Sequence, residues 1–112
     1  MSDRIYTPDR WVIVKITQEN DEVIHKVLAG WSGGYLDGDS WQLNSGITES
    51  RIDGDYYEFD GYSGSTYRCH KNGEGMNMIM LSALGQFQDM AKAAGKRDDR
   101  LVVIPVEEYL AG

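Results

Sequence analysis

The stretch "NGEGMNMIMLSALGQFQDMAKAAG", residues 72–95, decides the fold class, because the hydrophobic periodicity of the chain changes there. Its apolar residues recur at steps of three and four, which is the spacing of one face of an α-helix. The stripe consists of Met76, Met80, Leu84, Phe87, Ala91 and Ala94, widened by Ala83 and Met90. Gly95 suits the position just after a helix, and Lys92 lies near the negative helix end. The pattern therefore predicts one main helix over about residues 76–94.

The rest of the chain alternates between apolar and polar residues with a period of two, which is typical of β-strands. The expected strands cover residues 10–17, 22–31, 40–52 (broken near Ser45–Gly46), 55–60, 65–71 and 100–110. The first two flank the polar segment "QENDE" and should form a hairpin, whereas Pro105 places the last strand at a sheet edge or ends its pairing early. We expect an α+β fold with an antiparallel, meander-like sheet of about five to six strands, the helix packed on it, and a C-terminal strand.

Length and composition indicate one domain spanning residues 1–112. Apolar residues make up 41% of the chain, which favours a folded globule over disorder. No apolar run is as long as a membrane span, and the N-terminus lacks the pattern of a secretory signal. We therefore expect a cytoplasmic protein without membrane contact, in the host cytoplasm if the protein is viral. The single cysteine excludes an internal disulfide and a cysteine zinc cluster.

The negative charge is concentrated in the middle third of the sequence. The formal net charge is −7, and residues 30–66 carry seven acidic side chains against Arg51 alone. Direct binding to nucleic acid is disfavoured, because phosphate neutralisation requires clustered Lys and Arg. A protein partner with a basic surface fits this distribution better.

The same third contains the unusual stretch "GWSGGYLDGDSWQLNSG", residues 30–46, which is rich in glycine, aromatic residues and aspartate. Its "LDGDSW" echoes "IDGDYY" at 52–57, and Asp-Gly pairs favour tight hairpin turns. Neither segment has the ligand spacing of an EF-hand, and the stretch lacks the Lys and Ser/Thr of a phosphate loop. We therefore expect an irregular loop that feeds a strand, with no metal and no cofactor.

Exposed aromatic and acidic side chains in this third are the candidate contact residues for a partner, since Tyr and Trp are frequent interface anchors. The candidates are Trp31, Tyr35, Asp37, Asp39, Asp53, Asp55 and Tyr57. Trp41 is the aromatic residue of the stretch that we expect to be buried. Tyr35 and Trp31 would anchor the partner, while Asp37 and Asp39 would steer a positive surface toward it.

No catalytic constellation is evident. Cys69 and His70 are neighbours on a predicted strand, so their side chains should point to opposite faces, and His25 lies far away in the sequence. A buried structural thiol is the better interpretation of Cys69.

These features favour a small, acidic, non-enzymatic binding or regulatory protein that contacts a basic protein partner. Small acidic inhibitors, including viral ones that act against host defence or regulation, share this balance of charge. One alternative is a small-ligand binder or small enzyme with its pocket at the glycine-rich loop 30–46. Another is a structural or assembly protein acting through a sheet edge. The sequence leaves the oligomeric state, a homodimer included, open.

Overall fold

A computed structural model describes residues 4–34, 38–95 and 100–112, with the backbone alone at positions 33, 34, 38 and 39. In chain order the elements are β1 (Ile5–Tyr6), β2 (Arg10–Thr17), β3 (Val23–Gly34), β4 (Gly38–Leu43), β5 (Ile47–Asp53), β6 (Tyr56–Gly61), β7 (Thr66–His70), the 3₁₀ helix η1 (Lys71–Gly73), α1 (Met78–Ala93), β8 (Leu101–Ile104) and α2 (Val106–Ala111).

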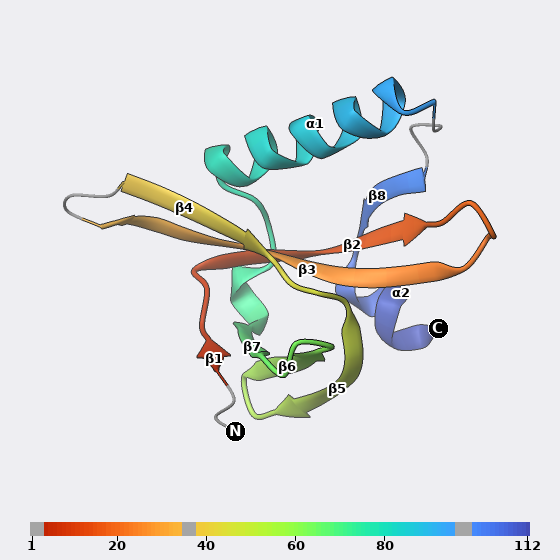
Figure 1. Ribbon diagram of the computed structural model, residues 1–112. Helices are drawn as coiled ribbons and strands as arrows, with labels where there is room; N and C mark the ends of the chain where they lie inside the picture. The colour runs from red at the N-terminus through yellow and green to blue at the C-terminus, as the bar shows by residue number, and fades with distance from the viewer. Residues whose placement is uncertain (1–3, 35–37, 96–99) are drawn as a thin grey trace.

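The strands form two sheets rather than one. The central sheet has the order β4-β3-β2-β8 and the outer sheet the order β1-β7-β6-β5. Helix α1 covers one face of the central sheet, and the outer sheet and α2 lie against its other face (Figure 1). The α+β class is confirmed, and each sheet contains a three-strand antiparallel meander, as β2-β3-β4 and β5-β6-β7.

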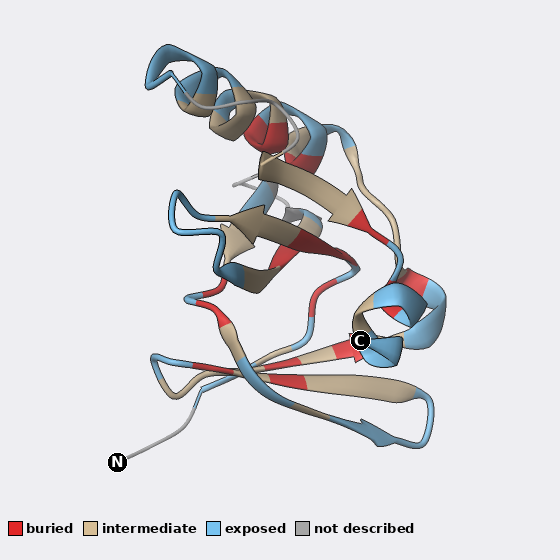
Figure 2. Ribbon diagram, turned by 90° about the vertical axis from the view of Figure 1, so that its right-hand side faces the viewer, coloured by how far each residue is buried: buried red, intermediate tan, exposed pale blue. Residues whose placement is uncertain are grey.

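Strand β2 is buried on both faces, and this follows from its unbroken apolar run. Trp11 and Ile13 point into the cluster shared with the outer sheet, whereas Val12 and Val14 pack beneath α1. All four side chains are buried. Buried residues accordingly gather where the central sheet faces its two neighbours, while the hairpin ends are exposed (Figure 2).

Helix α1 starts and ends close to the predicted positions. Asn77 caps it, because its side-chain oxygen accepts a hydrogen bond of 3.0 Å from the Met80 N–H. Gly95 follows its end with a φ of +82°, as expected of a residue after a helix. Met80 and Leu84 are buried as the stripe predicts, but Met90 is 66% exposed. Its assignment to the packed stripe was therefore wrong: it lies at the edge of the helical face, where the sheet no longer covers the helix.

The glycine-rich stretch is more regular than expected. Strand β3 continues to Gly34, which pairs with Gly38 at the start of β4, and an irregularity in the register lies between Trp31 and Gly34. This long two-stranded arm replaces the predicted irregular loop (Figure 1). At the echo segment, Gly54 adopts a φ of +60° in the β5–β6 turn, so the Asp-Gly turn chemistry applies there.

The C-terminal strand is shorter than predicted. β8 ends at Ile104, and Pro105 caps a short helix in place of further strand. Proline lacks the N–H needed to extend the ladder but suits a helix start. Val106 then enters the core, and Glu107 and Glu108 lie in the first turn, where negative charge is favourable.

Gly30 allows α1 to approach the central sheet. A Cβ at this position would lie 2.4 Å from the Sδ atom of Met80, whose side chain is fully buried and therefore cannot easily move away. We expect Gly30→Ala to lower the free energy of unfolding by about 1–3 kcal/mol, as overpacking does. Urea denaturation measures this.

Gly85 provides the matched control, because a Cβ there meets nothing within 4 Å and the residue lies inside α1. Gly85→Ala should raise stability by about 0.5–1 kcal/mol. If Gly30→Ala and Gly85→Ala changed the free energy of unfolding equally, the close packing of Met80 against Gly30 of β3 would not be what disfavours a larger residue at position 30.

Candidate functional site

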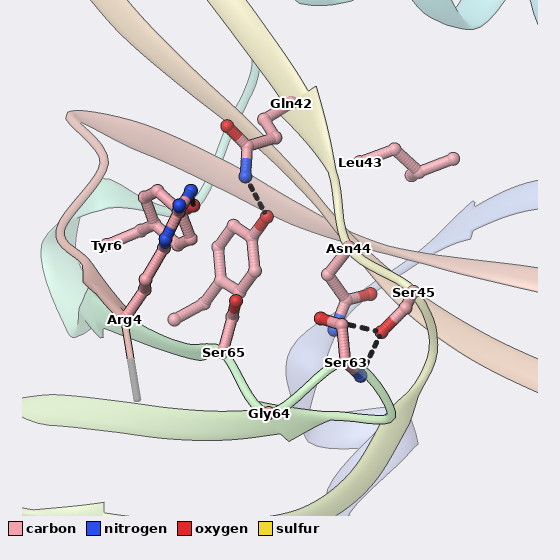
Figure 3. A pocket seen from close by; sticks show the side chains of 10 residues that line it. Arg4, Tyr6, Gln42, Leu43, Asn44, Ser45, Ser63, Gly64 and Ser65 are labelled. Atoms are coloured by element: carbon pink, nitrogen blue, oxygen red, sulfur yellow. Dashed lines mark hydrogen bonds between the residues drawn. The ribbon is translucent and has the colours of Figure 1, made fainter. Parts of the chain in front are cut away.

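A pocket opens where the chain passes from the central sheet to the outer sheet (Figure 3). Its walls come from β1, from the end of β4 with the following connection, and from the β6–β7 turn with the start of β7. The lining residues are Arg4, Tyr6, Gln42, Leu43, Asn44, Ser45, Ser63, Gly64, Ser65 and Tyr67. A volume of about 420 Å³ lies within the range of small-molecule sites.

Asn44 lies on the wall of this pocket and directly follows the end of strand β4. Its backbone N–H donates to the Val27 carbonyl at 3.0 Å, and its Oδ1 accepts from the Val27 N–H at 2.9 Å. The side chain thus replaces the carbonyl with which a continuing strand would pair, and the backbone is free to leave the sheet. Asn44 is 4% exposed, and its Nδ2 has no hydrogen-bond partner among the described residues.

Two turns form the wall beside Asn44. The Ser63 N–H donates to the Ser45 Oγ at 3.0 Å, and the Tyr62 N–H donates to the Gly46 carbonyl at 3.1 Å. A Cβ at Gly61 would lie 2.9 Å from the Ser45 Oγ and 3.2 Å from the Asn44 Nδ2, so this close packing requires glycine. Figure 3 shows Asn44, Ser45 and Ser63 side by side on the wall.

Two phenols form the opposite wall. The Tyr67 hydroxyl is buried and accepts a 2.7 Å hydrogen bond from the Gln42 Nε2. The Tyr6 hydroxyl accepts from the Arg4 Nη1 at 3.4 Å. The hydrogen bond from Arg4 lowers the pKa of Tyr6, whereas burial raises the pKa of Tyr67.

The pocket differs in charge from the chain as a whole. Of the described residues that line it, none is acidic and Arg4 is cationic, although the protein carries a net charge of −7. Nor do the lining residues include His or Cys, so the lining holds no group that ordinarily titrates near neutral pH. The arrangement offers hydrogen-bond donors but no general base of the usual kind.

The structure does not gather the predicted contact residues into one site. Trp31 borders the pocket, since its ring packs edge-on against Tyr6 at 6.2 Å and its Nε1 donates to the Thr7 carbonyl at 3.2 Å. Tyr35 and Asp37 lie outside the described residues, and only the backbone of Asp39 is described.

The remaining candidates lie elsewhere. Asp53 and Asp55 are exposed at the β5–β6 turn, at the opposite end of β6 from the pocket. Tyr57 instead packs in the core with Trp11, at a centroid distance of 5.7 Å. Trp41, which we expected to be buried, is 38% exposed and packs edge-on against Phe87 of α1. That prediction was wrong because β4 is an edge strand that α1 covers only partly.

Two arginines on the outer sheet pair with three of the seven acidic side chains of the acidic third. Arg51 contacts Glu58 at 2.9 Å and makes two hydrogen bonds, of 2.9 and 3.1 Å, to Asp60. Arg68, beyond the acidic segment in sequence, lies 3.3 Å from both Asp53 and Glu58. The sequence count of charge missed the pairs of Arg68 because this residue lies outside the acidic segment, and it is the pairing of β6 with β7 that places it opposite Glu58.

Cys69 and the histidines do not form a catalytic group. Cys69 is fully buried, and burial raises the pKa of its thiol. The His70 Nδ1 accepts from the Asn72 N–H at 3.0 Å and caps η1. His25 packs against Tyr109 on another surface, where desolvation lowers its pKa.

No family model matches this chain, and no curated protein or solved structure shows significant similarity to it. Within the described ranges, no helix is long and apolar enough to cross a membrane. The His, Cys, Asp and Glu side chains of the same ranges form no cluster of three or more that could hold a metal ion.

Sequence reasoning missed most of the pocket. The break near Ser45–Gly46 and the Ser63-Gly64-Ser65 turn were the available signals, since both interrupt strands. Nothing in the sequence shows that β1 brings Arg4 and Tyr6 to the same place. That contact depends on the parallel pairing of β1 with β7.

The hydrogen bonds of Asn44 should matter for stability. Asn44→Ala leaves the buried Val27 N–H without its side-chain acceptor, so we expect the free energy of unfolding to fall by about 1–3 kcal/mol. Asn20→Ala, which removes an exposed turn hydrogen bond to the Glu22 N–H, should change it by less than about 0.5 kcal/mol. Urea denaturation measures both variants. If Asn44→Ala and Asn20→Ala lowered the free energy of unfolding by similar amounts, the special role of Asn44 would be contradicted.

Stability should depend on the charge of Asp60. The hydrogen bonds from Arg51, and then from Thr66, lower the pKa of this carboxyl, so its contribution is present at neutral pH and is lost as the pH falls through that lowered pKa. Because Arg51 is half-exposed, the wild type should exceed Asp60→Asn by at most about 1 kcal/mol at pH 7.

The difference should shrink only below about pH 4, the ordinary range of an aspartate. Asp55→Asn, at an exposed position with no ion pair in the described structure, is the control and should show no such trend. Urea denaturation across the acid range measures both variants. A difference between wild type and Asp60→Asn that persists unchanged to pH 2 would contradict the assignment.

Proposed function

We propose that the protein is a non-enzymatic binding protein whose ligand site is the pocket between the two sheets. The observation that carries the proposal is the lining of the pocket, whose described residues offer many hydrogen-bond donors and no acidic group in an acidic chain. The pocket includes Gln42 to Ser45, so this proposal develops the small-ligand alternative for the stretch 30–46.

A binding role suits the lining better than catalysis does. General acid–base catalysis needs a group whose pKa lies near the working pH, and nucleophilic catalysis needs an activated side chain. The lining supplies hydroxyls, amides and a guanidinium instead. Such groups orient a polar ligand and determine specificity in binding sites.

Contact with a basic protein partner remains a second proposal, in which the protein acts as an inhibitor or regulator. It is supported by the exposed Asp53 and Asp55 at the β5–β6 turn. It is weakened by the arginine pairing of Asp53, Glu58 and Asp60, which leaves less free charge than the sequence count implies.

A titration of the ¹⁵N-labelled protein tests the pocket. Millimolar sugars, sugar acids, sugar phosphates and amino acids serve as probes, and amide shifts should concentrate at residues 43–46 and 62–66. Ser63→Leu, at an exposed lining position, should abolish them by filling the mouth. Ser82→Leu, on the exposed face of α1, is the matched control and should leave them intact. Shifts confined to other surfaces, or no shifts at all, would refute the proposal.

A further inference from the structure

We infer that the pocket recognises its ligand through a compact oxyanion, a carboxylate or a phosphate, bound by Arg4 and the Tyr6 hydroxyl at the mouth. The inference rests on the proposed function, because it names the class of ligand for the same pocket. It is carried by the direction of the hydrogen bonds, by the charge of the lining and by the buried amide of Asn44.

The hydrogen bonds between lining residues leave donors available. Tyr6 and Tyr67 each accept a hydrogen bond at the hydroxyl oxygen, from Arg4 and Gln42 respectively, and Gln42 and Ser65 also interact with the Tyr6 hydroxyl. A phenol that accepts one hydrogen bond can still donate its own proton, so both hydroxyls can act as donors to a ligand. Arg4 contacts Tyr6 through its Nη1, and within the described part of the chain the other N–H groups of its guanidinium remain for a ligand. The pocket therefore offers donors to a ligand rich in acceptor oxygens.

The charges around the pocket favour a negative ligand. Arg4 is the single charged residue among the described residues that line the pocket, and planar guanidinium groups bind carboxylate and phosphate oxygens in paired hydrogen bonds. Asp60, which directly precedes Gly61 at the wall, is already paired with Arg51 and Thr66 on the outer sheet. The carboxylate of Asp60 is thus paired with another arginine, on the outer sheet.

Asn44 provides a second, independent indication of an acceptor-bearing ligand. Its amide is nine-tenths or more buried, and its Nδ2 has no acceptor among the described residues. The amide lies beside Ser45 and Ser63 on the pocket wall (Figure 3). A buried donor without a partner costs about 1–3 kcal/mol, so an oxygen of a ligand that displaces the exposed Ser63 side chain would recover that cost.

The test uses two pairs of probes that differ in the anionic group. Ribose 5-phosphate is compared with ribose, and glucuronate with glucose, by titration of the ¹⁵N-labelled full chain. We expect one charged probe or both to bind at the pocket at least about tenfold more tightly than the neutral partner, because hydrogen bonds to charged groups are the stronger ones. The phosphate and carboxylate arms show which oxyanion is preferred.

Variants identify the residues responsible. Arg4→Gln should weaken binding of the charged probe at least about tenfold, and Tyr6→Phe about two- to tenfold, with little effect on neutral probes. Arg10→Gln removes the same charge at a position that does not line the pocket and should leave binding unchanged.

Three outcomes would overturn the inference. Equal binding of charged and neutral probes at the pocket would refute the oxyanion while leaving the pocket's binding role intact. Unchanged affinity in Arg4→Gln, with a folded protein shown by its amide spectrum, would refute the role of Arg4. If none of the four probes shifted the amide signals of the pocket, the inference would be overturned. The wider set of probes described under the proposed function would then decide whether the pocket binds a ligand at all.

Discussion

The pair of hydrogen bonds between Asn44 and Val27 is the constraint on which the two-sheet arrangement depends. A strand that leaves a sheet exposes the N–H and carbonyl groups of its former neighbour, and buried groups of this kind must find partners. Asn44 satisfies both groups of Val27 with one backbone donor and one side-chain acceptor. The chain can therefore turn at Gly46, where φ is +131°, and enter the outer sheet without leaving β3 unpaired. The pocket is the space beside this crossing.

A second link joins the sheets at Trp11. Its fully buried ring packs against Phe59 of the outer sheet, and its Nε1 donates to the His70 carbonyl at 2.7 Å. The Gly75 N–H donates in turn to the Trp11 carbonyl at 2.8 Å, which fixes the segment before α1. One tryptophan thus connects β2, β7 and the approach to the helix. A buried indole N–H requires a hydrogen-bond acceptor. The contact with His70 therefore fixes the position of the Trp11 ring relative to β7, in addition to burying the apolar surface of the ring.

Local signals and long-range placement differ in how far the sequence reveals them. The helix could be predicted because the stripe through Met80 and Leu84 repeats within one segment, and the first hairpin because its strands are separated by a short polar turn. The division into two sheets could not be predicted. An asparagine whose side chain replaces a strand carbonyl looks, in the sequence, like any polar residue at a strand end. Arg68 was missed for a related reason: its acidic partners lie on β5 and β6, and only the sheet brings them together.

An acidic chain can still contain a pocket that favours a negative ligand. Charges in water are screened over about 8 Å at physiological ionic strength, so acidic turns far from the pocket contribute little to its potential. Groups inside a pocket interact more strongly, because less water lies between them and the ligand. Arg51 and Arg68 hold Asp53, Glu58 and Asp60 of the outer sheet in ion pairs, which further limits the negative field near Arg4. The net charge then affects mainly how often an anion approaches, while contacts at the pocket determine how long it stays.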